Sequence, residues 1–319
     1  MSSFNQDHAE TPIICGMWGT SSLTLSLVSP KTGEIIETRT GRGVSKLSRD
    51  AIEEELFDIC GNWFSDVGVS EVYLGGMVGS TLGWWDVPYI ECPTELSDLP
   101  AETISKTFRG VRIAISPGLK CRNFLDEYDV IRGEEIELLA WLQTRPVQNE
   151  PRSLVCIPGT HTKWVEVVGD EVIRFQTSIA GELYDCLTAN GVLATKVSHG
   201  EISSLEAFLG GVDASVRHPN SLMQLLMSVR ARSLLAGQTP EEAADRLSGL
   251  LIGADVANAL ALTGFQEGRD ILPVIGTKNL AERYAVASRH IGVTPLPLNA
   301  VNIGVLGLYE LSKSLRSQA

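Results

Sequence analysis

The chain has 319 residues, of which 44 % are hydrophobic and 20 % charged, and its formal net charge is −13. This length and balance are typical of two globular domains of ordinary size. The acidic charge argues against nucleic acid or an anionic membrane as a partner, because both bind clustered lysine and arginine.

Targeting signals are also missing from the sequence. Residues 1–10 have neither the basic nor the apolar part of a signal peptide, and no uncharged apolar run is long enough to cross a bilayer. The six cysteines form no CxxC pair, which is typical of reduced thiols. We therefore expect a soluble, cytoplasmic protein.

The first half of the chain predicts an α/β domain. Apolar runs and turn residues predict strands at about 12–17, 23–29, 34–39, 71–75 and 111–118, and helices at about 48–66, 96–108 and onward from Arg132. A loop rich in glycine follows at 75–84. The polar stretch 144–153 contains two prolines and is the best candidate for a linker.

The second half of the chain begins as a repeat of the first. Residues 154–177 follow the order of features in 13–40: apolar strand, Gly-Thr turn, strand, glycine turn, strand. Helices are then predicted at about 178–190, 199–213, 219–235 and 239–262. A final strand runs into a third Gly-Thr turn and a helix. The repeat predicts two domains, 1–148 and 149–319, with the last helix (305–316) packing back on the first.

Each of the three Gly-Thr turns follows an apolar strand. Such turns offer backbone N–H groups and hydroxyls to phosphates, and a helix start adds a favourable dipole. The alternative is that all three only connect elements, but three together favour a nucleotide site. The sequence contains no G-x-x-x-x-G-K-[ST], G-x-G-x-x-G, H-E-x-x-H or G-x-S-x-G motif to suggest another chemistry.

Ten stretches, in this order, resemble the 2-dehydro-3-deoxygalactonokinases, sugar-acid kinases of the actin–hexokinase–heat-shock-ATPase superfamily. The stretches are WGTSSL (18–23), GVSKL (43–47), GGMVGSTLGW (75–84), VPYIECP (87–93), PGL (117–119), VIRGEEIEL (130–138), PGTHTKWV (158–165), TSIAGELYDCL (177–187), SGLLIGADVA (248–257) and IGTKNLAERY (275–284). They cover nearly the whole chain, and RGEE, PGTHTKW and GMVGS are the most specific among them.

The resemblance implies two actin-like (ribonuclease H-like) α/β domains with a nucleotide cleft between them. It implies ATP and Mg²⁺ as cofactors, and transfer of the γ-phosphate to the terminal hydroxyl of 2-dehydro-3-deoxy-D-galactonate in galactonate breakdown. The partners would be the small sugar acid and ATP, and a homodimer is left open. The alternatives are a kinase of another sugar acid and an inactive sugar-acid binding protein.

Candidate nucleotide-binding residues lie in the three turns. The phosphates would contact the first two turns, because phosphoryl transfer needs positioning and charge neutralisation. Adenosine would lie against the third turn. His161 and Lys163 could equally be structural. The candidates are Gly19, Thr20, Ser21, Ser22, Gly159, Thr160, His161, Thr162, Lys163, Gly276, Thr277 and Asn279.

Candidate residues for the sugar acid lie in the first domain. Arg132 is the expected partner of the substrate carboxylate, because guanidinium binds carboxylate in a bidentate manner. Gly79, Ser80 and Trp84 would contact the sugar. Glu134, ahead of Glu135, is the candidate general base for the attacking hydroxyl, although acids also suit a first helical turn.

Met17 and Thr24 depart from the family pattern, which places aspartate and arginine at these two positions. A thioether does not hold hydrated Mg²⁺, so the metal site is left unknown. The chain could be an inactive variant, it could bind sugar acid without phosphorylating it, or Glu182 or Asp255 could anchor the metal instead.

Overall fold

The computed structural model describes residues 11–145, 152–193, 200–299 and 302–317. Contacts within the chain divide it into two units. Unit 1 contains residues 1–120, 130–146 and 302–319, and unit 2 contains residues 121–129 and 147–301. Most of the expected linker, residues 146–151, lies outside the described residues, as do residues 1–10.

Unit 1 is built on a mixed sheet with the order β3-β2-β1-β4-β8-β7. Its strands are β1 (Ile13–Trp18), β2 (Ser22–Val28), β3 (Ile35–Arg42), β4 (Glu71–Gly75), β7 (Ile104–Phe108) and β8 (Val111–Ile115). β1 and β2 are antiparallel, as are β2 and β3, whereas β1, β4 and β8 run parallel to one another. The three parallel strands are almost wholly buried, which explains their continuous apolar runs.

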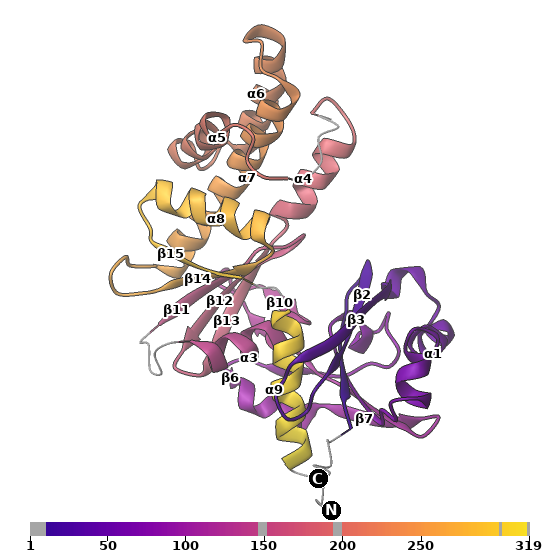
Figure 1. Ribbon diagram of the computed structural model, residues 1–319. Coiled ribbons are helices and arrows are strands. Elements are labelled where there is room, and N and C mark those ends of the chain that lie inside the picture. Colours follow the sequence, from indigo (N-terminus) through magenta and orange to yellow (C-terminus); the bar gives the residue numbers. More distant parts are fainter. Residues whose placement is uncertain (1–10, 146–151, 194–199, 300–301, 318–319) are drawn as a thin grey trace, which may run out of the picture. The chain divides into compact units, whose positions relative to one another are not determined.

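The helices of unit 1 pack on this sheet and on each other (Figure 1). They are α1 (Arg49–Ser65), α2 (Leu99–Glu102), α3 (Glu134–Thr144) and α9 (Ile303–Ser317), with short 3₁₀ turns η1 (Val44–Lys46), η2 (Met77–Gly79) and η3 (Leu96–Asp98). α1 buries Ile52, Leu56 and Cys60, which are four residues apart and therefore share one face. α9 approaches α3 so closely that a Cβ on Gly307 would lie 2.0 Å from the Ile136 carbonyl oxygen.

Unit 2 repeats the topology of unit 1 with different strands. Its sheet runs β15-β14-β11-β12-β13, formed by β11 (Ser153–Ile157), β12 (Thr162–Val168), β13 (Glu171–Ser178), β14 (Leu272–Gly276) and β15 (Pro295–Asn299). The first three strands form an antiparallel meander, and β14 and β15 are parallel to β11. β11 therefore corresponds to β1, as the sequence repeat predicts, and β14 takes the place in its sheet that β4 takes in the sheet of unit 1.

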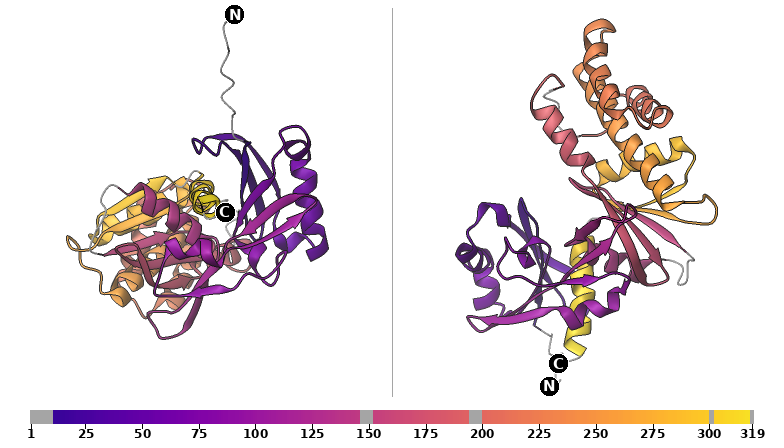
Figure 2. Two further views of the ribbon diagram at one scale, coloured as in Figure 1. Left: turned by 90° about the horizontal axis from the view of Figure 1, so that it is seen from below. Right: turned by 180° about the vertical axis from the view of Figure 1, so that it is seen from behind.

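The helices of unit 2 are α4 (Ala180–Ala189), α5 (Leu205–Arg217), α6 (Leu222–Leu235), α7 (Pro240–Thr263) and α8 (Lys278–Ile291). α7 begins with a capping box formed by Thr239 and Glu242. It packs on α5 through two glycines, since a Cβ on Gly249 would lie 2.0 Å from the Phe208 carbonyl oxygen and one on Gly253 2.7 Å from Val212 Cα. Figure 2 shows α5, α6 and α7 (orange) grouped together when seen from behind.

One predicted helix is wrong. Residues 96–108 form the short η3 and α2, after which the chain turns into strand β7. Pro100 lies at the start of α2, which ends after one turn, and Ile104–Phe108 pair with β8 instead. The short strands β5 (Tyr89–Glu91), β6 (Thr94–Glu95), β9 (Gly118–Arg122) and β10 (Tyr128–Ile131) have no counterpart in the prediction.

Within the described ranges, no helix combines the length and the apolar character that a transmembrane span needs.

Candidate active site

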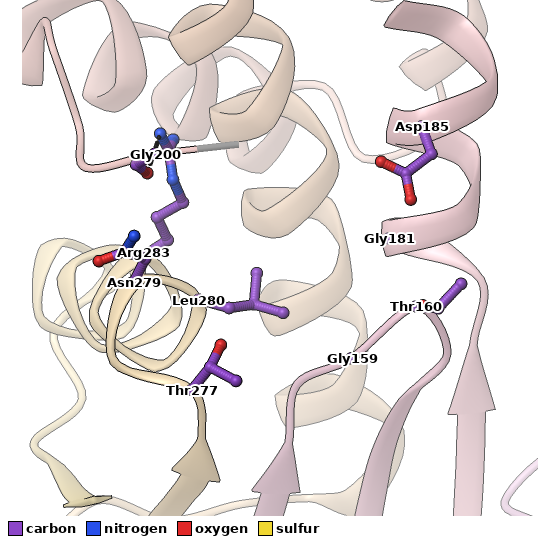
Figure 3. A pocket seen from close by; sticks show the side chains of 9 residues that line it. All are labelled: Gly159, Thr160, Gly181, Asp185, Gly200, Thr277, Asn279, Leu280 and Arg283. Carbon is purple, nitrogen blue, oxygen red and sulfur yellow. Dashed lines mark hydrogen bonds between the residues drawn. The ribbon is translucent and has the colours of Figure 1, made fainter. Parts of the chain in front are cut away.

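Unit 2 contains a hollow of about 360 Å³ beside the second Gly-Thr turn (Figure 3). Four parts of the chain line it: the turn between β11 and β12, the first turns of α4, the first turns of α8, and Gly200 before α5. The lining residues are Gly159, Thr160, Gly181, Asp185, Gly200, Thr277, Asn279, Leu280 and Arg283. Four of them, Gly159, Thr160, Thr277 and Asn279, are predicted nucleotide-binding residues that the fold brings together.

The turn on one wall of the hollow rests directly on the start of α4. The Glu182 N–H donates to the Thr160 carbonyl at 2.8 Å. A Cβ on Gly181 would lie 2.3 Å from the Gly159 carbonyl oxygen, so this position requires glycine. The exposed His161 ring bonds the Glu182 carboxylate. The backbone of α4 therefore fixes the conformation of the turn.

The remaining predicted nucleotide residues of unit 2 lie around this hollow but do not line it. Gly276 ends β14 and is packed against Pro158. Lys163 is buried in β12. Thr162 is buried as well, and its hydroxyl is 2.8 Å from the Tyr284 hydroxyl.

Sequence reasoning missed four residues of the hollow: Gly181, Asp185, Gly200 and Leu280. The glycine of the AGEL stretch, directly after a predicted strand, was the one available signal. Arg283, which also lines the hollow, and its neighbour Tyr284 are both buried. Arg283 pairs with the buried Asp245 at 2.9 Å, which anchors α8 to α7.

In unit 1, the first Gly-Thr turn joins β1 to β2 and exposes its hydroxyls. Gly19 N–H donates to the Ser22 carbonyl at 2.9 Å, and Thr20, Ser21 and Ser22 are exposed. A neighbouring loop supports the turn: Ser45 N–H and hydroxyl both donate to the Thr20 carbonyl, at 3.1 and 2.8 Å. All four predicted residues of this turn are thus held together by the backbone.

Arg132 is buried in unit 1 with part of its guanidinium unpartnered. The residue is 8 % exposed. One terminal nitrogen donates to the Val87 carbonyl at 2.7 Å, and the group lies 4.2 Å over the Tyr89 ring. Nε and Nη1 are buried with no hydrogen-bond partner among the described residues. Because a buried unpaired donor is costly, this arrangement favours an anionic ligand.

Three glutamates follow Arg132 at the start of α3. Glu134 is half-buried and accepts the Arg132 N–H at 3.0 Å. Glu135 is fully buried and accepts the Gly133 N–H at 2.6 Å, and burial together with the Glu134 charge raises its pKa to about 7. Burial and the two neighbouring carboxylates raise the pKa of Glu137 to about 8.

The glycine-rich loop lies beside Arg132. A Cβ on Gly79 would lie 2.9 Å from Arg132 Nη1, so glycine leaves room for the guanidinium. Ser80 is buried and donates its hydroxyl to the Met77 carbonyl at 2.7 Å. The buried Trp84 ring packs on Trp85 and Phe108, with ring centroids 5.0 and 4.7 Å apart.

Met17, at the end of β1, faces three glycines. Cβ atoms built on Gly75, Gly133 and Gly304 would lie 3.2 Å from its Sδ, 3.5 Å from its Cε and 2.6 Å from its Cγ. The thioether therefore fills the space between β4, the start of α3 and the start of α9. Its partner across the hairpin is Thr24.

The side chains present do not form a site for a resident Mg²⁺. The described residues hold no group of three or more His, Cys, Asp or Glu side chains that could bind a metal. Met17 offers no oxygen ligand, and Glu182 is paired with His161. Asp255 accepts hydrogen bonds from Trp164 Nε1 at 3.1 Å and from the Tyr284 hydroxyl at 2.7 Å.

The sheet order and the repeated strand–turn–strand meander of the two units define a duplicated α/β protein of the actin-like fold. A carbohydrate kinase from Novosphingobium aromaticivorans has the same fold, with a TM-score of 0.50, 11 % identity, and coverage of 95 % of this chain and 93 % of that chain. The expected α/β, actin-like fold is thereby confirmed.

The chain belongs to the 2-keto-3-deoxy-galactonokinase family, whose sequence model matches residues 17–311. It is 32 % identical over 276 residues to a 2-dehydro-3-deoxygalactonokinase of Escherichia coli strain K12, covering 86 % of this chain and 88 % of the relative. It is 30 % identical over 302 residues to a probable enzyme of the same name from Rhizobium meliloti strain 1021, covering 93 % and 95 %.

A crystal structure from Sinorhizobium meliloti, provisionally given the same enzyme name, is also similar. It has a TM-score of 0.83 and 29 % identity, and covers 95 % of this chain and 99 % of that chain. The resemblance read from the sequence is confirmed, and by family the chain is a sugar-acid kinase.

Proposed function

We propose that the chain transfers the γ-phosphate of ATP to the terminal hydroxyl of 2-dehydro-3-deoxy-D-galactonate. Family membership supports the reaction class, since the relatives carry the name of this kinase. The single observation that carries the proposal for this chain is Arg132, a buried arginine with two unpartnered donor nitrogens.

The sugar acid would bind in unit 1. Arg132 Nε and Nη1 would donate to the substrate carboxylate, a charge-assisted pairing about twice as strong as a neutral one. The ring of Tyr89 and the Val87 carbonyl hold the guanidinium in place, so little side-chain freedom would be lost on binding. Gly79 leaves room for the guanidinium, and Ser80 and Trp84 would support the loop around it.

Glu134 would act as the general base. It stands two residues from Arg132 and is half-buried, so a substrate hydroxyl can reach its carboxylate. Glu135 is enclosed by Gly133 and Ser116 and would instead order the start of α3.

The nucleotide would bind in the hollow of unit 2. Gly159 and Thr160 offer a turn whose backbone is fixed by α4, and Thr277 with Asn279 present the N-terminus of α8. A volume of about 360 Å³ is in the range of small-molecule sites. In unit 1, Thr20, Ser21 and Ser22 would offer further donors to the phosphates. Mg²⁺ would enter as part of MgATP.

Met17 favours a second candidate function, sugar-acid binding without phosphoryl transfer. Its thioether occupies the end of β1, beside the glutamates of α3, with no oxygen to offer a metal or a phosphate-bound ion. Losing one preorganised electrostatic partner costs a factor of roughly 10²–10³ in rate. Arg132 would serve the binding protein equally well.

A split between binding and turnover tests the proposal. In a coupled ADP-release assay, Arg132→Gln should raise the KM for the sugar acid by about 100-fold and leave the KM for ATP unchanged. Glu134→Gln should lower kcat by roughly 10²–10⁴ while sugar-acid binding, followed by calorimetry, persists.

The matched control is Arg109→Gln, which removes an exposed arginine paired with Glu53 and Glu54 in unit 1. It should behave like the unaltered chain. An unchanged KM for the sugar acid in Arg132→Gln would exclude the proposed carboxylate site, and near-normal turnover in Glu134→Gln would exclude this glutamate as the base.

A further inference from the structure

A chain of hydrogen bonds runs through the interior of unit 2 beneath the Gly-Thr turn. The Thr162 and Tyr284 hydroxyls are 2.8 Å apart, and the Tyr284 hydroxyl donates to Asp255 Oδ2 at 2.7 Å. The second carboxylate oxygen accepts from Trp164 Nε1 at 3.1 Å. The chain links β12, α8 and α7, elements that are far apart in the sequence.

The direction of these hydrogen bonds follows from the number of protons. A tyrosine hydroxyl has one hydrogen, and Tyr284 donates it to the Asp255 carboxylate. An ionised carboxylate has no hydrogen to donate and can only accept. Thr162 must then donate its own hydrogen to the Tyr284 oxygen. The hydroxyl of Thr162 is therefore committed to the interior and is not a free donor for a phosphate, contrary to the role expected from the sequence.

Two neighbouring members of this network, Thr162 and Tyr284, lie beside opposite walls of the hollow. Thr162 directly follows the turn that contains Gly159 and Thr160. Tyr284 lies one turn along α8 from Leu280 and next to Arg283, which line the other wall in Figure 3. Arg283 is itself tied to Asp245 of α7 at 2.9 Å, so two adjacent residues of α8 are anchored to the same helix.

We propose that Tyr284 and Asp255 are positioning residues that set the separation between the β11–β12 turn and the start of α8, and thereby the fit of the nucleotide. The identity of the ligand in this inference rests on the proposed function, whereas the positioning of the turn rests on the hydrogen bonds alone. Burial supports it, because Tyr284 and Thr162 are inaccessible to solvent and their hydroxyls have no water to replace a lost partner.

The network has a built-in response to pH. Burial raises the pKa of Asp255 to about 6, against the hydrogen bonds from Tyr284, Ser178 and Trp164 that lower it. The other titratable group whose charge interacts with it is Cys156 of β11, whose thiol is held neutral because burial raises its pKa. Protonation of Asp255 would make its carboxyl group a weaker acceptor for the Tyr284 hydroxyl. The hydroxyls of Tyr284 and Thr162 would then no longer be held to one direction of donation.

Tyr284→Phe tests the inference, because it removes one hydroxyl and keeps the ring. Without ligand, backbone hydrogen exchange should become at least threefold faster in two peptides, 157–163 and 180–184. These two segments are joined by the hydrogen bond from the Glu182 N–H to the Thr160 carbonyl. The Kd for MgATP, measured by calorimetry at pH 7.5, should rise about tenfold.

Tyr73→Phe is the matched control. Tyr73 is another buried tyrosine, in unit 1, whose hydroxyl donates to Glu71 at 3.1 Å. Tyr73→Phe should leave both the hydrogen exchange of the two peptides and the Kd for MgATP unchanged. Asp255→Asn is the second variant: it should raise the Kd at pH 7.5, and its Kd should change less between pH 7.5 and 5.5 than the Kd of the unaltered chain or of Tyr73→Phe.

The outcomes separate the two proposals. Unchanged exchange of the turn in both Tyr284→Phe and Asp255→Asn would overturn the inference. Faster exchange with no MgATP binding by the unaltered chain would support the positioning of the turn and contradict the nucleotide site. An unchanged Kd for MgATP in Tyr284→Phe, when the unaltered chain binds, would show that the network does not set the fit of the nucleotide.

Discussion

The turns after β1 and β11 have the same topology but different surroundings. The first is supported by the loop containing Ser45, and the strand before it ends in Met17, a thioether packed among glycines. The second is supported by the backbone of α4, lies beside a hollow of about 360 Å³, and is followed by Thr162 in a buried polar network. A repeated scaffold therefore does not imply a repeated site.

The two units also differ in where charge is buried. Unit 1 concentrates glutamates at the start of α3, where Glu135 and Glu137 have raised pKa values. At the start of α4 in unit 2, Glu182 is exposed and paired with His161. We infer that unit 1 carries proton chemistry and anion recognition, and that unit 2 carries nucleotide recognition.

The dependence of the second turn on α4 leads to a prediction of large effect. In Gly181→Ala, the new Cβ would lie 2.3 Å from the Gly159 carbonyl oxygen, and backbone cannot be displaced as a flexible side chain can. The turn should move, and the KM for ATP should rise at least tenfold while the KM for the sugar acid stays within twofold.

Gly61→Ala provides the control for that variant, because a Cβ at Gly61 in α1 meets nothing within 4 Å. Its kinetics should match those of the unaltered chain. An unchanged KM for ATP in Gly181→Ala, with the fold verified by circular dichroism, would mean that the turn does not contribute to the nucleotide site.

Buried charge in unit 1 leads to a prediction of smaller effect. The folded-state pKa of Glu137 is about 8 against an ordinary value of 4.5, so the folded protein holds a proton that the unfolded chain releases between these pH values. Glu137 should therefore cost stability as pH rises from about 5 to 8. Glu137→Gln should have a Tm about 2–4 °C higher than the unaltered chain at pH 8.5, and little difference at pH 5.

Glu242→Gln serves as the comparison, because Glu242 is a half-buried glutamate in a capping box at the start of α7. It should give no such gain at pH 8.5. An equal Tm difference for Glu137→Gln at both pH values would contradict a raised pKa at this position.

Much of the fold could be predicted from the sequence, because the repeated meander and the long amphipathic helices depend on local patterns. The helix expected at 48–66 is α1 (Arg49–Ser65), and that at 239–262 is α7 (Pro240–Thr263). The error at 96–108 has a non-local cause. The pairing of Ile104–Phe108 with β8 depends on a partner strand and overrides a helix-compatible sequence.

The site was less accessible to sequence reasoning. The Gly-Thr motifs located Gly159, Thr160, Thr277 and Asn279, since the turn chemistry is local. No local signal could indicate that Thr162 bonds a tyrosine 122 residues away, or that Arg283 pairs with Asp245. Contacts of this kind arise only when helices from distant parts of the chain meet on one sheet.

The most direct test of the central claim is a coupled ADP-release assay with 2-dehydro-3-deoxygalactonate, on the unaltered chain and on Met17→Asp. The proposed kinase predicts ADP release by the unaltered chain that depends on the sugar acid. No ADP release by the unaltered chain, together with ADP release by Met17→Asp, would favour the second candidate function, sugar-acid binding without phosphoryl transfer. No ADP release by either protein, although calorimetry shows that each binds the sugar acid, would contradict phosphoryl transfer to this sugar acid.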